Sequence, residues 1–183
     1  ATTMTRRGLS PPVVSTTGGS GGYAGRVVVP ADAPVGIPAG LTTDVGAALV
    51  ADGRTAVGLA EAAAFAPGER VLVAPAAGGV GSLLVQLALQ VGATVVATAG
   101  GNHKLAAAQA LGAAEGHDYL APGWGEAIEP VDVVLDGVGG EIGAAAFARL
   151  RPGGRYLPFG AAGGAFAPVD RASAWDRDIT VLS

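Results

Sequence analysis

The stretch Arg70–Gly92, RVLVAPAAGGVGSLLVQLALQVG, decides the fold of this chain. A short apolar run is followed by a turn of small residues and then by apolar side chains at helical spacing, which predicts a strand, a glycine turn and a helix. Gly78 has no Cβ, so backbone can come close to a ligand there, and Gly81 lets the helix pack close to the strand. The helix would direct unpaired N–H groups and its positive dipole end at the turn. This arrangement suits a pyrophosphate.

Composition limits the class of protein. The chain has 183 residues, of which 50% are hydrophobic and 14% charged, so it is globular with a large core. The net charge is −4 and there is no basic run, so we expect no nucleic-acid partner. The absence of cysteine excludes disulfides and thiolate chemistry. No apolar run reaches the roughly 18–20 residues of a membrane span. We expect no membrane partner and a cytoplasmic location.

Three segments are expected along the chain. Residues 1–22 are rich in Pro, Ser, Thr and Gly and predict a flexible arm or a remnant of another element. Residues 23–42 predict a hinge strand, Tyr23–Pro30, and a loop with two prolines. Residues 43–183 predict a dinucleotide-binding Rossmann domain.

Strands and helices alternate regularly in this last segment. Helical patterns cover 44–65, with a break at 52–54, and then 79–91, 102–111 with Asn102 as N-cap, and 140–149. Strand patterns cover 71–74, 94–99, 116–119, 131–136, 155–160 after a turn at 152–154, and 179–182. The predicted fold class is therefore α/β, a doubly wound parallel sheet. Its ligand should lie at the carboxyl ends of the strands, where strand order reverses.

The turn Ala76-x-Gly78-x-x-Gly81 matches a dinucleotide fingerprint with alanine in the first position. A chance match is the alternative in a chain with 31 glycines. The strand before the turn, the helix after it and a second strand at the right distance favour nucleotide binding. A P-loop is excluded because no Gly-Lys-Ser/Thr follows.

The segment 97–104, ATAGGNHK, indicates which nucleotide is bound. An NAD site carries an acidic residue about 20 positions beyond the glycines, which accepts from the ribose 2′-hydroxyl. No acid stands here, whereas Lys104 would attract a 2′-phosphate. We therefore predict NADPH over NADH; the alternative is that Lys104 is a solvated helix residue.

The blocks from Arg70 to Gly100, then Lys104, LGA at 111–113, HDY at 117–119, VDVVLDGVGGE at 131–141 and GGRYLPFGAAGG at 153–164 resemble the quinone oxidoreductase branch of the medium-chain dehydrogenase/reductase superfamily. The resemblance runs from about Tyr23 to the end of the chain. It implies that the turn holds pyrophosphate and that Lys104 and Tyr119 bind the 2′-phosphate. It also implies that the loop at 137–139 lies near the adenosine ribose and the nicotinamide, and that the loop at 159–161 lies under the nicotinamide.

The resemblance extends to Arg54-Thr55-Ala56, which is similar to a Leu-Thr-Ala element beside the nicotinamide, with Arg in place of Leu. Ordinary core packing is the alternative for Tyr119 and Phe159. The cofactor-binding residues predicted in this way are Thr55, Ala76, Gly78, Gly79, Val80, Gly81, Gly100, Lys104, Tyr119, Val138, Gly139, Phe159, Gly160 and Ala161.

The chain also departs from this family. A member would have a catalytic domain before the Tyr23 region and a closing segment after the last strand, so the resemblance implies a chain truncated to the cofactor domain. No metal is expected, because a zinc site needs Cys and His ligands, and the chain has no Cys and two His. No catalytic residue is assigned: Tyr23 is one conceivable proton donor, Tyr156 suits the core, and Asp132 and Asp136 suit structural roles at the ends of a strand.

Three functions remain open. The first is an NADPH-dependent quinone or enone (enoyl) reductase, in which NADPH delivers hydride to an activated carbon. The second is an NADPH-binding module that works with a partner chain. The third is a relative that performs a non-redox cyclisation or isomerisation on a polyketide-like substrate. A homodimer through the last strand is a further expectation, with fraying of that strand as the alternative.

Overall fold

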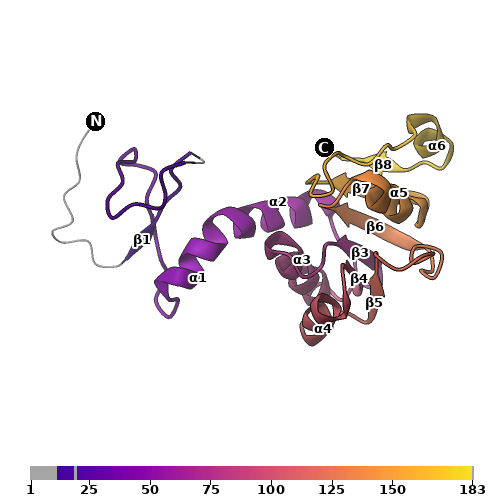
Figure 1. Ribbon diagram of the computed structural model, residues 1–183, viewed down its shortest axis with the longest axis horizontal. Helices are drawn as coiled ribbons and strands as arrows, with labels where there is room; N and C mark the ends of the chain where they lie inside the picture. Colours follow the sequence, from indigo (N-terminus) through magenta and orange to yellow (C-terminus); the bar gives the residue numbers. More distant parts are fainter. Residues whose placement is uncertain (1–11, 19, 183) are drawn as a thin grey trace. The chain divides into compact units, whose positions relative to one another are not determined.

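The computed structural model describes residues 12–18 and 20–182 (Figure 1). Residues 1–11, half of the predicted arm, lie outside the described residues. The chain forms two compact units, Ala1–Thr55 and Ala56–Ser183. In the first unit, β1 (Val13–Val14) pairs antiparallel with β2 (Val35–Gly36), and α1 (Thr43–Ala48) leads into a π-helical segment, η1 (Leu49–Gly53).

Two predictions for this part of the chain are wrong. Tyr23–Pro30 is irregular rather than a strand, and the side chains of Tyr23 and Val28 are exposed. A strand needs a neighbour for its backbone hydrogen bonds, and no described segment pairs with this run. The predicted helix break at 52–54 is instead a π-helical turn, which carries the chain directly into α2 (Arg54–Ala63) because such a turn accommodates an extra residue.

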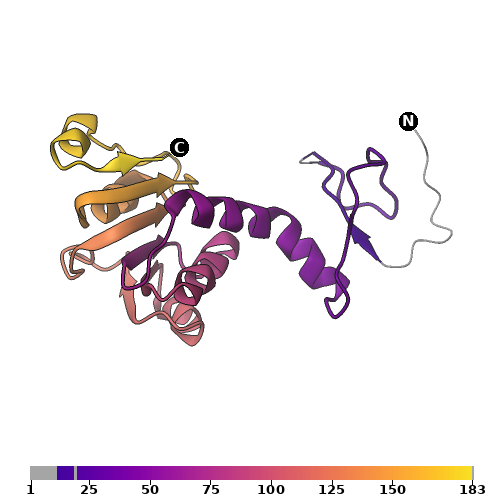
Figure 2. The ribbon, with the colours of Figure 1, turned by 180° about the vertical axis from the view of Figure 1, so that it is seen from behind.

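The second unit is built on a six-stranded parallel sheet in the order β5-β4-β3-β6-β7-β8 (Figures 1 and 2). The strands are β3 (Arg70–Ala74), β4 (Thr94–Ala99), β5 (Glu115–Asp118), β6 (Val131–Asp136), β7 (Leu150–Pro158) and β8 (Thr180–Val181). The helices between them are α3 (Gly79–Gln90), α4 (Asn102–Ala110), α5 (Gly140–Ala148) and α6 (Arg171–Asp176). The strand order reverses between β3 and β6, which confirms the predicted doubly wound α/β fold.

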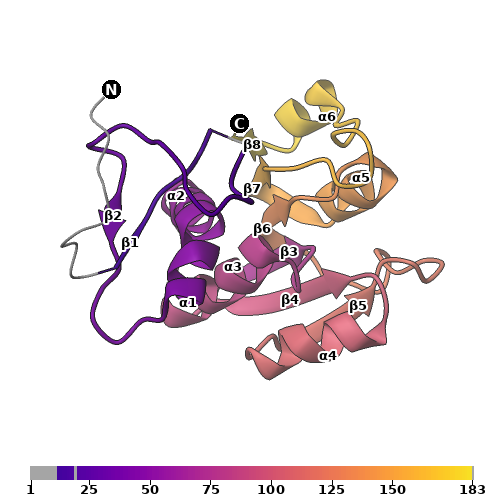
Figure 3. The same cartoon turned by 60° about the vertical axis from the view of Figure 1, so that its left-hand side comes forward.

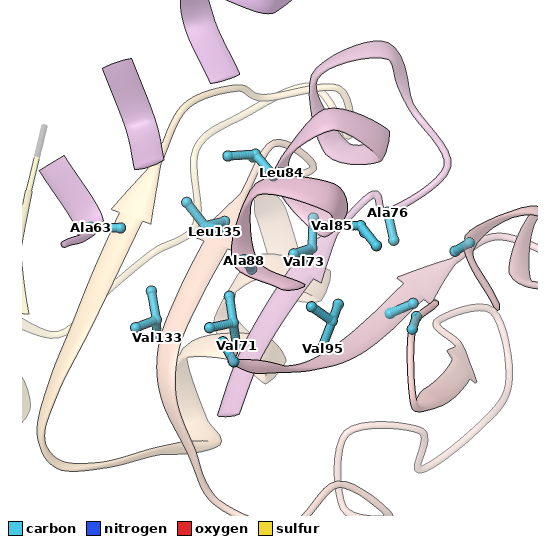
Figure 4. Packing of buried hydrophobic residues seen from close by; sticks show 14 of the residues in the cluster. Ala63, Val71, Val73, Ala76, Leu84, Val85, Ala88, Val95, Val133 and Leu135 are labelled. Carbon is cyan, nitrogen blue, oxygen red and sulfur yellow. The ribbon is translucent and has the colours of Figure 1, made fainter. Parts of the chain in front are cut away.

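Alternating residues of the strands divide the core into two layers. Val71 and Val73 of β3 point to one layer, where they pack with α2, α3 and α4; Figure 4 shows this packing around Leu84. Leu72 and Ala74 point to the other layer, where α5 and α6 cover the sheet (Figure 3). Both faces of the central strands are thus buried, which explains their continuous apolar sequences.

Three details of the second unit differ from the prediction. Asn102 is the first residue of α4 and not its cap, because Gly101, at φ 93°, occupies the cap position. Residues 152–154 lie within β7, whose pairing with β6 shifts register between Val131 and Val133. The helix α6 was not predicted, since it has only six residues. No helix among the described residues is long and apolar enough to cross a membrane.

Candidate functional site

All the strands that carry predicted site residues are parallel, so the turns that follow them meet at one edge of the sheet. The turn after β3 holds the fingerprint. The N–H of Ala76 donates to the Thr98 carbonyl at 2.9 Å, and its methyl group is buried in the core. Ala76 therefore links the turn to β4 through its backbone, and its methyl group anchors the turn in the core.

The start of α3 presents free donors at this turn. Its cap, Gly78, is extended at φ −75° and ψ 169°, and no side chain caps the helix. The N–H groups of Ala77, Gly79, Val80 and Gly81 donate to no protein oxygen within the described part of the chain. Unpaired N–H groups at a helix start bind anions, because the helix dipole adds to their own positive charge. The turn can therefore hold a phosphate group.

Gly81 is where the helix comes closest to the strand. A Cβ at Gly81 would overlap the Pro75 carbonyl oxygen and lie 2.9 Å from the Pro75 carbonyl carbon. A Cβ at Gly78 would meet Pro75 at 3.4 Å, which is ordinary contact. The two glycines therefore differ in role: Gly81 is required by the packing of the fold, whereas Gly78 has room for a side chain in the free protein.

The edge next to β4 and β5 gathers Gly100, Lys104 and Tyr119. A Cβ at Gly100 would lie 3.0 Å from Tyr119 Cε2 and 3.3 Å from its hydroxyl, so the tyrosine ring covers this glycine. The N–H of Lys104 donates to the Gly101 carbonyl at 3.1 Å, which places the exposed lysine in the first turn of α4. The Tyr119 hydroxyl thus lies beside Gly100, and Lys104 stands in the first turn of the helix that follows. A hydroxyl and an ammonium group are suitable donors for a phosphate monoester.

Asp118 links the turn after β4 to the turn after β5. It was not among the predicted site residues. Its Oδ1 accepts the N–H of Gly101 at 3.0 Å and the N–H of Leu120 at 2.9 Å. The segment after β4 lacks an acid, as the sequence showed, but β5 supplies this carboxylate from the side. Asp118 comes close to Gly101 because β5 pairs parallel with β4, with Asp118 opposite Ala99. The sequence alone does not show this pairing.

The loops after β6 and β7 are joined by backbone hydrogen bonds. Phe159 donates to Asp136 O (2.8 Å), Ala162 to Gly137 O (3.2 Å), Gly163 to Val138 O (2.7 Å) and Gly140 to Ala165 O (2.9 Å). We call these two loops, 137–140 and 159–165, the paired loops. The paired loops contain the predicted residues Val138, Gly139, Phe159, Gly160 and Ala161.

The paired loops also lie against the turn after β3. The N–H of Gly137 donates to the Ala74 carbonyl at 2.6 Å, and a Cβ at Gly137 would lie 2.6 Å from the Phe159 ring and 3.3 Å from Pro75. Phe159 packs partly buried against the core layer of α3. The fold therefore places every predicted site residue of the second unit at the carboxyl edge of the sheet. Thr55 belongs to the first unit, where its hydroxyl donates to the Ala51 carbonyl at 3.1 Å.

No group of three or more His, Cys, Asp or Glu side chains among the described residues is arranged to hold a metal ion. The described residues therefore do not make a zinc site. That the whole protein works without zinc stays a prediction.

Known proteins resemble this chain in sequence and fold. The family model described as zinc-binding dehydrogenase matches residues 79–183. The chain belongs to this family. Within the zinc-binding dehydrogenases it falls in the quinone oxidoreductase-like branch of the medium-chain dehydrogenase/reductase superfamily, as the sequence predicted.

Three relatives illustrate the match. The quinone oxidoreductase of Thermus thermophilus, solved also in complex with NADPH, is 35% identical with a TM-score of 0.75, over 93% of this chain and 58% of its own. The CurK enoyl reductase is 31% identical with a TM-score of 0.70, over 82% and 46%. The polyketide synthase GfsB of Streptomyces halstedii is 38% identical over 144 residues, which are 77% of this chain and 3% of that protein. The chain therefore spans about half the length of these reductases and a small part of the synthase.

Proposed function

We propose that this chain binds NADPH along the carboxyl edge of its sheet and forms the cofactor-binding part of a reductase for an activated C=C bond or a quinone. The observation that carries the proposal is the pairing of two phosphate positions on one edge. Free N–H groups at the start of α3 suit the pyrophosphate, and Lys104 with Tyr119 suits the 2′-phosphate. Membership of a family with NADPH complexes among its solved structures supports the same reading.

Bound NADPH would supply the hydride. The part of the chain's own residues is to bind and to orient: the turn after β3 holds the diphosphate, and the paired loops place the nicotinamide. Tyr156 is not available as a proton donor to substrate, because it is buried and its hydroxyl is bound to Asp136 at 2.5 Å.

The 2′-phosphate assignment is tested by Lys104→Gln, which removes the only lysine of the chain. Loss of a hydrogen bond between charged groups costs about 1.5–3 kcal/mol, so NADPH affinity should fall roughly 10–100-fold. NADH affinity should change less than about twofold, because NADH has no 2′-phosphate. The control is Arg171→Gln, which removes one positive charge from the exposed start of α6. Equal losses for both nucleotides, or the same loss in the control, would contradict the assignment.

Within the reductase class, an enoyl thioester is the substrate we favour. Several curated relatives are polyketide synthases, and one solved relative is an enoyl reductase. The test follows NADPH absorbance with a small enoyl thioester and with a small quinone. Faster consumption with the thioester supports this choice, and consumption with the quinone alone contradicts it.

Two other functions stay as alternatives, and each has its own outcome in the same assays. Tight NADPH binding with no turnover, and a catalytic partner recovered with the chain, would favour the binding module. Absence of NADPH binding would favour a non-redox cyclisation or isomerisation.

We also propose a homodimer through β8, which is at the edge of the sheet and pairs only with β7 among the described strands. Val181 of β8 and Trp175 of α6 are both exposed, with 44% and 86% of their surface accessible. Exposed apolar edges tend to pair. Sedimentation equilibrium at micromolar concentration tests this, and a monomer mass would contradict it.

A further inference from the structure

A fully buried carboxylate lies at the end of β6, directly below the paired loops. Asp136 Oδ1 accepts the N–H groups of Val138 and Gly139, both at 2.9 Å, and its Oδ2 accepts the hydroxyl of Tyr156 at 2.5 Å. Asp136 and Tyr156 lie on neighbouring strands, since Tyr156 pairs in register with Val134. One side chain thus connects the backbone of the first paired loop to the core of the strand that leads into the second.

The surrounding residues leave room for this carboxylate. A Cβ at Gly143 of α5 would overlap Asp136 Oδ2 and lie 2.9 Å from its Cγ. A Cβ at Gly139 would overlap the Ala165 carbonyl oxygen, and Gly139 has a φ of 72°. Two glycines are therefore needed for the carboxylate below the loop and for the close approach of the second loop above it.

A buried carboxylate loses its hydration, which costs free energy. Hydrogen-bond donors around the carboxylate must offset this desolvation cost. Here two backbone N–H groups and one hydroxyl do so. Burial and the hydrogen bond to Asp136 both raise the pKa of Tyr156, so its hydroxyl keeps its proton and acts as the donor.

These hydrogen bonds set the orientation of the peptide groups in the first paired loop. The N–H groups of Val138 and Gly139 point to Asp136, and the Gly137 and Val138 carbonyls accept from Ala162 and Gly163 of the second loop. If the carboxylate were lost, both N–H groups would be left unpaired in the core, and the loop would have to rearrange.

We infer that Asp136, held by Tyr156, is the positioning residue for the nicotinamide half of the cofactor: it fixes the two paired loops as one unit without touching the cofactor itself. This inference rests on the proposed function. It assigns the orientation of the nicotinamide half to one buried carboxylate, while the adenosine phosphate half depends on the turns after β3, β4 and β5.

The experiment compares two ligands in three variants of the full chain. NADPH carries both halves, and its nicotinamide fluorescence reports an ordered bound ring. The nucleotide 2′,5′-ADP carries only the adenosine half and is measured by calorimetry. The variants are Asp136→Asn, Tyr156→Phe and the control Asp132→Asn. Asp132 is on the same strand at its other end, where it accepts from the Arg70 N–H and from Arg151.

Loss of one hydrogen bond to a charged group should weaken NADPH binding about fivefold in Tyr156→Phe and about tenfold or more in Asp136→Asn. The affinity for 2′,5′-ADP should stay within about twofold, and the control should leave both affinities unchanged. The fluorescence of bound NADPH should fall in the two variants, because the ring is held less firmly. Tyr156→Phe keeps the carboxylate and the ring, so it serves if Asp136→Asn does not fold.

The outcomes separate the inference from the proposed function. If the wild-type chain binds neither NADPH nor 2′,5′-ADP, the proposed function fails. If it binds both, and Tyr156→Phe weakens them equally or changes neither, the proposed function stands and the positioning role of Asp136 is wrong.

Discussion

The contrast between Gly81 and Gly78 gives a sharp test of the phosphate-binding turn. In Gly81→Ala the new methyl group would overlap the Pro75 carbonyl oxygen and crowd two further backbone carbons, at 2.9 and 3.2 Å. Backbone cannot rotate away as a flexible side chain can, so α3 must move outward from β3. That movement opens the layer in which Leu84, Val85 and Ala88 are completely buried.

Crowding of a packed core costs about 1–3 kcal/mol, and displacement of a whole helix should bring the loss to the upper end of that range. For a unit of this size, a loss of about 2–3 kcal/mol lowers the melting temperature by roughly 10 °C. NADPH binding should also be lost, because the N–H groups at the start of α3 move with the helix.

Gly78→Ala is the matched comparison. Its backbone conformation is open to any residue, and its new methyl group would meet Pro75 only at 3.4 Å. Alanine is a poorer cap than glycine by up to about 1 kcal/mol, so the melting temperature should fall by no more than about 5 °C. NADPH affinity should nevertheless fall about tenfold or more, because the methyl group stands where the ligand needs close approach to the backbone.

Thermal denaturation and NADPH titration of both variants test these two roles. The reasoning is refuted if Gly81→Ala melts with the wild type, or if Gly78→Ala is stable and binds NADPH with unchanged affinity. The first result would mean that the helix is not held against the strand at Gly81. The second would mean that the ligand does not approach the turn at Gly78.

Three further predictions concern the stability of the second unit. Leu84→Ala removes a fully buried side chain and should lower the free energy of unfolding by about 2–5 kcal/mol in a denaturant titration. Gly139→Ala should cost at least about 3 kcal/mol and Gly140→Ala about 1 kcal/mol, because both have positive φ but only Gly139 lacks space for a Cβ; equal costs would contradict the close approach of the paired loops. Burial raises the pKa of Glu69, but the hydrogen bonds from Arg155 and from the Ala66 N–H outweigh it, so the net pKa lies below the ordinary value. Glu69 therefore stabilises the fold above its unfolded pKa and loses this effect as pH falls. The difference in free energy of unfolding between wild type and Glu69→Gln should narrow from about pH 6 to about pH 3. A difference that stays constant over this range would contradict the prediction.

Much of the fold could be read from the sequence because its signals are local. The strand, turn and helix of Arg70–Gly92 each have their own periodicity, and the same holds for the strands at 94–99 and 131–136. Tyr23–Pro30 also had a strand-like pattern, yet it is irregular, because a strand depends on a partner that one segment's sequence does not show. The π-helical turn at 49–53 was missed because an Asp-Gly pair predicts a break equally well.

Site residues could be predicted where the residue type and its spacing in the sequence were enough. They were missed where their role depends on a group that only the fold brings near. The glycines of the turn and the single lysine could be named from spacing. Asp118 and Asp136 were not assigned to the site, since their importance comes from the N–H groups of Gly101 and Val138, which only the folded chain brings to them. The position of Asp136 at the carboxyl end of a buried strand was the one available signal.

The central claim is that this edge of the sheet is built for a nucleotide with a 2′-phosphate. Its most direct test is the affinity of the wild-type chain for NADPH and for NADH, measured side by side at one ionic strength. Lys104 at the start of α4 and Tyr119 after β5 predict that NADPH binds more tightly by about tenfold or more. Equal affinity for the two nucleotides would contradict the account.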